Sequence, residues 1–142
     1  MATDQIIVQS EVAAQFSQIL KESLAKGANE QPLPKVVSHV SKARLQGLLS
    51  QAVERGASVI FGDSGKASLP GTAVIPTVLE GVNQSSDMYD EESFGPVAAL
   101  TVVDSEDEAV NLANGSKYGL SASVFTKDLR KGLDIAKRLE SG

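Results

Sequence analysis

Short β-branched segments alternate with helix-like segments along this chain, and that alternation constrains the fold more than any other feature of the sequence. Strand-like runs of apolar and β-branched residues occur at 5–9, 58–61, 97–103 and 121–126. Apolar residues at helical spacing occur at 10–26, 41–55, 105–114 and 128–139. Because strands and helices alternate, we predict an α/β fold, a layered domain with a mainly parallel sheet flanked by helices.

The ends of the predicted helices carry local signals. Side chains suited to cap a helix N-terminus occur at Ser10, Ser105 and Asp128. Glu108 follows Ser105 by three residues, which completes a capping box. Gly27 and Gly56 are predicted to end the first two helices, because glycine readily adopts the left-handed backbone of a helix C-terminus.

Periodicity also predicts which residues are buried. The first helix is expected to turn one apolar face to the core, made of Val12, Phe16, Ile19, Leu20 and Leu24. The last helix is expected to bury Leu129, Leu133, Ala136 and Leu139. Glycine, serine and aspartate at 62–71 predict a surface loop, and Pro76 argues that residues 72–82 form an edge or bulged strand.

Length and charge narrow the class of protein. With 142 residues, of which 42% are hydrophobic, the chain suits one buried core, so we predict a single domain over residues 1–142. A net charge of -5 disfavours nucleic acid, whose phosphates require clustered lysine and arginine. No apolar run approaches the roughly 20 residues that span a bilayer. We expect a cytoplasmic protein with no nucleic-acid and no membrane partner.

The sequence contains no cysteine and one histidine, His39. These counts exclude a thiolate nucleophile, disulfides and a multi-histidine metal centre, so we predict no metal site. Acid-base chemistry then falls on carboxylates, lysines and tyrosines, with His39 as a further candidate because histidine titrates near neutral pH. The competing interpretation is that His39 lies in an irregular loop without a partner.

An acidic cluster follows the middle of the chain. It comprises Asp87, Tyr89, Asp90, Glu91 and Glu92. Crowded carboxylates favour general acid chemistry, and we name Glu92, Asp90 and Tyr89 as catalytic candidates, although a solvated acidic loop explains the same pattern. A basic cluster at Lys35, Lys42 and Arg44 is interpreted as an exposed helix start that could alternatively hold a carboxylate or phosphate.

Several sequence blocks together resemble one enzyme family. They are Asp-Gln-Ile-Ile-Val-Gln at 4–9, Glu-Glu-Ser-Phe-Gly-Pro at 91–96, Leu-Ala-Asn at 112–114 and Tyr-Gly-Leu-Ser-Ala-Ser-Val-Phe-Thr at 118–126. In content and spacing these blocks resemble the NAD(P)-dependent aldehyde dehydrogenase superfamily. Ser93 is similar to the serine found in subgroups that act on aromatic aldehydes such as salicylaldehyde.

The resemblance implies that the chain corresponds to the C-terminal portion of a truncated catalytic domain, beginning after the family's nucleophilic cysteine. Glu92 and Phe94 match the family residues that face the nicotinamide end of the cofactor. A carboxylate there accepts hydrogen bonds from ribose hydroxyls, and an aromatic ring packs beside the nicotinamide. The alternative is that both residues persist through loop geometry and packing alone. The family's Rossmann domain, glutamate base and oxyanion asparagine have no counterpart, so we expect no cofactor and no dehydrogenase activity from this chain alone.

Three functional hypotheses follow. The first is a protein reused for non-redox acid-base chemistry on a small carbonyl or polyketide-type substrate, such as cyclisation, isomerisation or elimination. The second is a non-catalytic binding module that forms a homo-oligomer or joins another chain through exposed sheet edges. The third is an incomplete part of an ordinary NAD-dependent aldehyde dehydrogenase.

Overall fold

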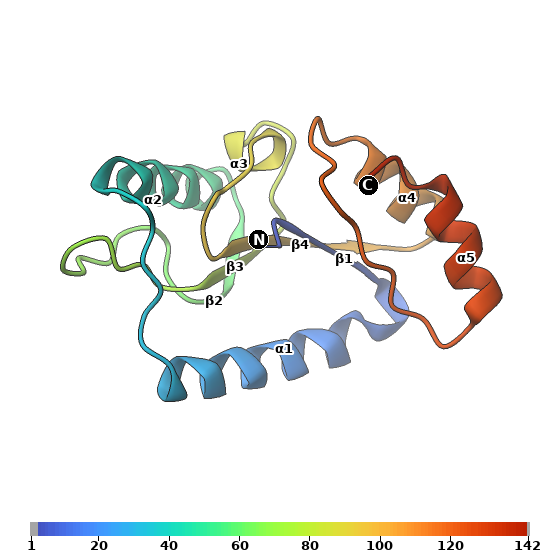
Figure 1. The fold of residues 1–142 in the computed structure, drawn as a ribbon, viewed down its shortest axis with the longest axis horizontal. Helices are drawn as coiled ribbons and strands as arrows, with labels where there is room; N and C mark the ends of the chain where they lie inside the picture. The colour runs from blue at the N-terminus through green and yellow to red at the C-terminus, as the bar shows by residue number, and fades with distance from the viewer. Residues whose placement is uncertain (1–2, 142) are drawn as a thin grey trace.

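The computed structural model describes residues 3–141, which form a four-stranded sheet with helices on both of its faces (Figure 1). The strands lie in the order β1 (Gln5–Gln9), β4 (Val97–Val103), β3 (Thr77–Glu80) and β2 (Ser58–Phe61). β1 pairs with β4 and β4 with β3 in parallel, and β2 pairs with β3 in antiparallel orientation. The predicted layered α/β fold with a mainly parallel sheet is confirmed.

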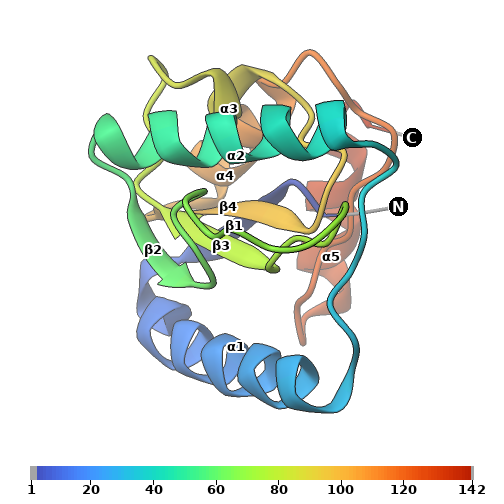
Figure 2. The same ribbon diagram turned by 90° about the vertical axis from the view of Figure 1, so that its left-hand side faces the viewer.

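Helices cover the two faces of the sheet unequally. The long helix α1 (Ser10–Glu30) lies under one face, and α2 (His39–Glu54) with the short α3 (Asp87–Asp90) lies over the other (Figure 2). α4 (Glu106–Asn114) contacts β1 and β4, and α5 (Leu129–Arg138) packs beside α4 beyond the β1 edge of the sheet (Figure 1). Among residues 3–141, no helix combines the length and the hydrophobicity needed to cross a membrane.

Alternation along the central strands produces two cores, one on each face of the sheet. Leu79 of β3 and Leu100 of β4 are both 0% exposed. Leu79 belongs to the cluster packed under α2, whose members include Leu45, Leu49 and Ala99. Leu100 belongs to the cluster packed on α1, whose members include Val8, Val78 and Leu24. Neighbouring strand residues point to opposite faces, so one strand supplies both cores.

Local signals at the helix ends are mostly confirmed. Ser105 Oγ accepts a hydrogen bond from the Glu108 N–H at 3.1 Å, and Asp128 accepts from two backbone N–H groups at the start of α5. Gly56 has a φ of 104°, as expected for the glycine after a helix. The prediction for α1 is wrong at both ends. Its N-cap residue is Gln9 without a side-chain bond, and the helix continues past Gly27 to Glu30 because glycine weakens a helix without ending it.

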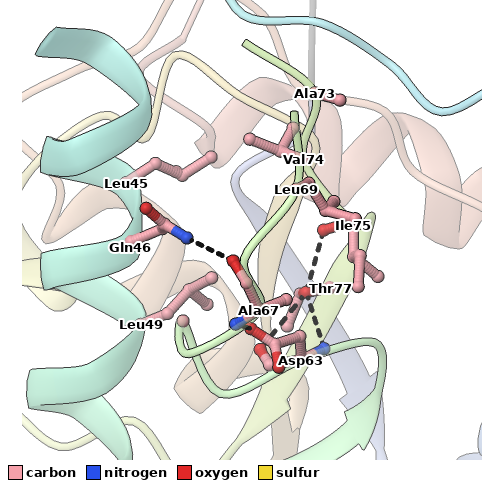
Figure 3. A pocket seen from close by; sticks show the side chains of 11 residues that line it. Leu45, Gln46, Leu49, Asp63, Ala67, Leu69, Ala73, Val74, Ile75 and Thr77 are labelled. Carbon is pink, nitrogen blue, oxygen red and sulfur yellow. Dashed lines mark hydrogen bonds between the residues drawn. The ribbon is translucent and has the colours of Figure 1, made fainter. Parts of the chain in front are cut away.

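The glycine-rich segment 62–71 is a docked loop, more firmly held than the predicted surface loop. Figure 3 shows the loop beside α2, where Gln46 Nε2 donates to the Ala67 carbonyl at 2.9 Å. The buried Lys42 donates from Nζ to the Leu69 and Gly71 carbonyls at 2.5 and 3.0 Å. The lysine assigned to an exposed helix start therefore anchors a loop. Between loop and helix remains a cavity of about 20 Å³, enough for roughly one water molecule.

The strand predicted at 72–82 forms only over part of that range, and the prediction that it is an edge or bulged strand is wrong. β3 lies inside the sheet, between β4 and β2, and begins at Thr77. Pro76 immediately precedes the strand, so its missing N–H removes no bond from the ladder. The pairing register shifts between Val59 and Phe61 of β2, which face Leu79 and Val78, so the extra residue lies in β2 and not in the strand predicted to be bulged.

The C-terminal region departs furthest from prediction. Residues 121–126 are not a strand, and the backbone of Ala122 to Phe125 forms no hydrogen bond with the other residues described. A strand needs a neighbour to pair with, and none lies in register here. The apolar face of α5 is also open, because Leu129 and Leu133 are exposed instead of buried.

A similar correction applies to α1. Leu20 and Leu24 pack against the sheet core as expected. The remaining members of the predicted apolar face, Val12, Phe16 and Ile19, are exposed. With about 3.6 residues per turn, Val12, Phe16 and Ile19 lie on the flank of α1 beside the stripe of Ala13, Leu20 and Leu24 that packs against the sheet core.

Candidate functional site

The loop formed by residues 91–96 joins α3 to β4 and contains the candidate site. Phe94 has a φ of 50°, and among the described residues it is the single non-glycine with a positive φ. The next residue, Gly95, lies so close to α2 that a Cβ there would stand 2.7 Å from Leu45 Cδ2. The loop is therefore sharply turned and pressed against the helix.

Arg44 of α2 fastens this loop from one side. Its Nη1 donates to the Ser93 carbonyl at 3.2 Å, and its Nη2 donates to the Glu92 carbonyl at 2.9 Å. Nη2 also forms an ion pair with Glu91 Oε2 at 2.7 Å. One guanidinium thus engages three successive residues, which a planar group with five N–H donors can do.

Asp4 fastens the same loop from the other side. Its Oδ1 accepts from the Ser93 N–H at 3.1 Å and from the Ser93 hydroxyl at 2.5 Å. The Asp4 carbonyl in turn accepts from the Ala99 N–H at 2.8 Å, which ties the start of β1 to β4. Ser93 itself is buried, with 6% exposure. The loop backbone is therefore fixed on both sides.

The two residues proposed to face a cofactor project from this fixed backbone. Phe94 is 76% exposed. Glu92 is half-buried, and its carboxylate has no hydrogen bond or ion pair with any residue in the described range 3–141. A carboxylate in this state can accept two hydroxyl groups of a ligand, and an exposed ring can stack against a flat one.

The other acidic candidates are engaged separately. Asp90 forms an ion pair with Lys117 at 3.1 Å, and Asp87 accepts from Gln51 Nε2 at 2.9 Å. Tyr89 is half-buried on the short helix α3, directly before Asp90. Tyr89, Asp90 and Glu92 are thus close only because they are near in the chain, and within residues 3–141 no hydrogen bond joins their side chains.

His39 is placed apart from this cluster. It is the first residue of α2 and is exposed, and within residues 3–141 its side chain bonds to none of the other candidates. The structure assigns no partner that would orient its ring. No three potential metal ligands gather within the described part of the chain either.

The cavities do not enclose these residues. The cavity in Figure 3 is lined by α2 and the segment 63–77, and at about 20 Å³ it is too small for an aldehyde. A larger open groove of about 420 Å³ lies between the extended segment 122–126 and α5. Its lining includes Val124, Leu129 and Leu133, and none of the candidate residues.

Sequence reasoning missed the two residues that hold the loop. The charge of Arg44 predicts only an exposed helix start, and Asp4 stands out only as part of a block that resembles the family. Both act across long separations, 47 to 49 residues for Arg44 and 89 for Asp4. No local pattern in the sequence could have paired them with Glu91, Glu92 or Ser93.

Comparison with known proteins places this geometry in context. The aldehyde dehydrogenase family pattern matches residues 1–142. The chain is 37% identical over 148 residues to a vanillin dehydrogenase of Pseudomonas fluorescens, covering 100% of this chain and 30% of that protein. It is 32% identical over 149 residues to a salicylaldehyde dehydrogenase of Pseudomonas putida, with the same coverage of each.

Solved structures agree with these sequence matches. A succinic semialdehyde dehydrogenase from Streptococcus pyogenes, in complex with NADP+, superposes with a TM-score of 0.87 at 29% identity, over 98% of this chain and 32% of that one. A salicylaldehyde dehydrogenase from Pseudomonas putida G7, complexed with salicylaldehyde, gives 0.85 at 29% identity, over 98% and 29%. The chain spans about 30% of the length of the curated relatives it matches.

Proposed function

Because this chain belongs to the aldehyde dehydrogenase family, we propose that it forms the wall of a catalytic domain that faces the nicotinamide end of a bound NAD(P). The observation that carries the proposal is the loop 91–96, whose backbone is fixed by Arg44 and Asp4 while Glu92 and Phe94 remain open. Glu92 would accept the ribose hydroxyls, and Phe94 would limit movement of the nicotinamide ring.

In this proposal the chain provides one end of a cofactor site but does not catalyse aldehyde oxidation by itself. The 142 residues contain no cysteine, so they hold no thiol that could form a thioacyl intermediate. Pure protein mixed with NAD+ and vanillin or benzaldehyde should therefore yield no NADH, measured by absorbance. Steady NADH production from the 142-residue chain would contradict the proposal.

A ligand fragment tests the positive part of the proposal. Nicotinamide mononucleotide carries the nicotinamide and its ribose without the adenine half, so it should bind weakly, with a Kd on the order of 1 mM. In ¹⁵N-resolved NMR spectra, the perturbed amides should be those of residues 91–95. Glu92→Gln should reduce these shifts several-fold, because a neutral amide is a weaker acceptor. Equal shifts in wild type and Glu92→Gln, or none in either, would overturn the assignment.

The substrate class follows from the relatives and remains part of the proposal. Two relatives matched over the whole chain are named for vanillin and salicylaldehyde, both of which are aromatic aldehydes. We propose a small aromatic aldehyde as the carbonyl substrate of the complete active site. A second chain or a second copy is the proposed partner, because the open groove at α5 and exposed side chains such as Phe125 lie uncovered. Cytoplasmic location stays a prediction.

The non-redox hypothesis draws no support from the comparisons, since the relatives cited above are all named as dehydrogenases. Its catalytic set of Glu92, Asp90, Tyr89 and His39 is not joined by hydrogen bonds within the described residues. The cavities described above enclose none of the four. Cyclisation or isomerisation of a polyketide-type substrate therefore stays a hypothesis.

A further inference from the structure

We propose that Ser93 and Asp4 form a positioning pair that sets the left-handed backbone of Phe94 and thereby aims Glu92 and Phe94 at their ligand. The inference rests on the proposed function for the identity of that ligand, but its geometric part is independent. Arg44 holds the outer side of the same loop and leaves the Ser93 side chain to Asp4.

The first step concerns the direction of the Ser93 hydroxyl proton. Three acceptors lie near Ser93 Oγ: Asp4 Oδ1 at 2.5 Å, the Gly95 carbonyl at 3.3 Å and the Val97 carbonyl at 3.4 Å. A hydroxyl has one proton, and a carboxylate at the shortest distance is the strongest acceptor. The proton therefore points to Asp4.

The second step concerns the lone pairs of Ser93 Oγ, which remain free to accept a hydrogen bond while its proton points to Asp4. Ser93 Oγ lies 3.3 Å from the Gly95 N–H, which can donate to it. A bond from the N–H two residues on to a serine oxygen closes a small turn around the residue between them. That residue is Phe94, whose φ of 50° is unfavourable for a phenylalanine left to itself. The Ser93 hydroxyl therefore donates to Asp4 and accepts from the Gly95 N–H, and these two bonds together hold the strained backbone of Phe94.

The third step is that Asp4 is itself immobilised. Its carbonyl is bonded to the Ala99 N–H, and Gln5 next to it pairs with Ala99 in the parallel register of β1 and β4. Asp4 directly precedes β1, so its carboxylate is held by the sheet and cannot follow movements of the loop. The pair therefore fixes the loop relative to the sheet and not merely within itself.

An aliphatic side chain at position 93 would remove both functions. The Asp4 carboxylate would lose its hydroxyl partner, and the Gly95 N–H would lose the oxygen that closes the turn. Threonine would retain both, because its hydroxyl occupies the same position on Cβ. Ser93→Ala and Ser93→Thr therefore separate the hydroxyl from the bulk of the side chain.

Hydrogen exchange in the 142-residue chain tests the geometric part without any ligand. Ser93→Ala should accelerate exchange of the Ser93 and Gly95 amides by at least about tenfold, whereas Ser93→Thr should stay within about threefold of wild type. Ser85→Ala is the matched control, since Ser85 also makes a 2.5 Å hydroxyl bond, to Asn83, in the loop before α3. It should leave the exchange at 93 and 95 unchanged.

Titration with nicotinamide mononucleotide tests the aiming. Ser93→Ala should weaken the ligand-induced shifts at residues 91–95 several-fold, with restoration in Ser93→Thr. If Ser93→Ala loses its dispersed spectrum, Asp4→Asn serves instead, because it keeps an acceptor oxygen but removes the charge that holds the hydroxyl proton. Unchanged exchange at Ser93 and Gly95 in both variants would overturn the positioning pair. Accelerated exchange together with no ligand response in wild type would support the pair and refute the proposed ligand.

Discussion

The sheet region, residues 3–110, and the C-terminal region, residues 111–141, follow the same local rules but differ completely in burial. Every buried residue of the described chain lies at or before Val110. Both regions contain well-capped helices, α4 at Ser105 and α5 at Asp128. The contrast teaches that capping and periodicity are sufficient to shape a helix, while a core requires a second surface to face it.

The C-terminal region is attached to the sheet region mainly by polar contacts. Arg138 bonds to Asp107 at 2.5 Å, and Lys117 Nζ forms an ion pair with Asp90 at 3.1 Å. Its apolar side chains face outward instead, with Phe125 95% exposed. Surface ion pairs contribute little to stability, so this region should open locally well before the sheet unfolds.

Deletion of core methyl groups should give the largest difference between the regions. Leu79→Ala removes a fully buried side chain and should lower the free energy of unfolding by about 3 kcal/mol. Leu133→Ala removes the same atoms from α5, where the side chain is 53% exposed. It should change the free energy of unfolding by less than about 0.5 kcal/mol. Urea unfolding followed by circular dichroism measures both.

An equal cost for the two leucines would break the comparison. Coverage of α5 by a second copy of the chain in solution would produce such a result. Repeating the Leu133→Ala measurement at several protein concentrations distinguishes this, because stability that depends on association varies with concentration.

Two glycines with positive φ test whether contact with a neighbouring element also decides the cost of a substitution in a loop. Gly65 has a φ of 86°, and a Cβ there would stand 2.4 Å from the Gln46 carbonyl oxygen. Gly65→Ala should therefore cost about 2 kcal/mol or more of unfolding free energy, by combining backbone strain with a clash. Gly71 has a φ of 59° but open space around it, so Gly71→Ala should cost about 1 kcal/mol. Matching losses in thermal or urea unfolding would show that backbone strain alone acts.

Much of the fold could be predicted because its signals are local. The β-branched runs and the caps at Ser105 and Asp128 predict most of the strands and helices without any tertiary contact. The predictions failed where a partner surface decides the outcome. Residues 121–126 have strand-like composition, but no neighbouring strand pairs with them. Leu129 and Leu133 repeat at helical spacing, but no core faces them.

In the candidate site too, residues in a local sequence block could be predicted, whereas residues that act through tertiary contacts could not. Glu92 and Phe94 could be named from a short block of adjacent residues. The residues that hold their loop could not, because Asp4 reaches Ser93 across 89 positions of the chain. Arg44 illustrates the point further, since its charge suggested an exposed helix start whereas it bonds to three loop residues. Tertiary hydrogen bonds leave no periodic trace in a sequence.

Removal of each helix cap should sharpen the contrast between global and local stability. Ser105→Ala and Asp128→Ala each delete a side chain that accepts backbone N–H bonds, at a cost of about 1 kcal/mol. α4 carries the buried Val110, so Ser105→Ala should lower the unfolding midpoint of the whole domain. Asp128→Ala should accelerate amide exchange only within α5. A lowered global midpoint in Asp128→Ala would show that the two regions unfold together.

The smallest expected effect concerns the ion pair that joins α5 to α4. A hydrogen bond from Lys131 to Glu106 raises the pKa of Lys131 above its ordinary value of 10.5. A raised lysine pKa stabilises the folded state below the unfolded pKa, and the contribution disappears as pH rises through the folded pKa. Glu106→Gln should therefore lower the melting temperature by less than about 2 °C near pH 9, since surface pairs are weak, and the difference should disappear at a higher pH at which Lys131 is deprotonated. A difference between the variants that persists at the higher pH would mean that Glu106 stabilises the domain through a contact other than the lysine charge.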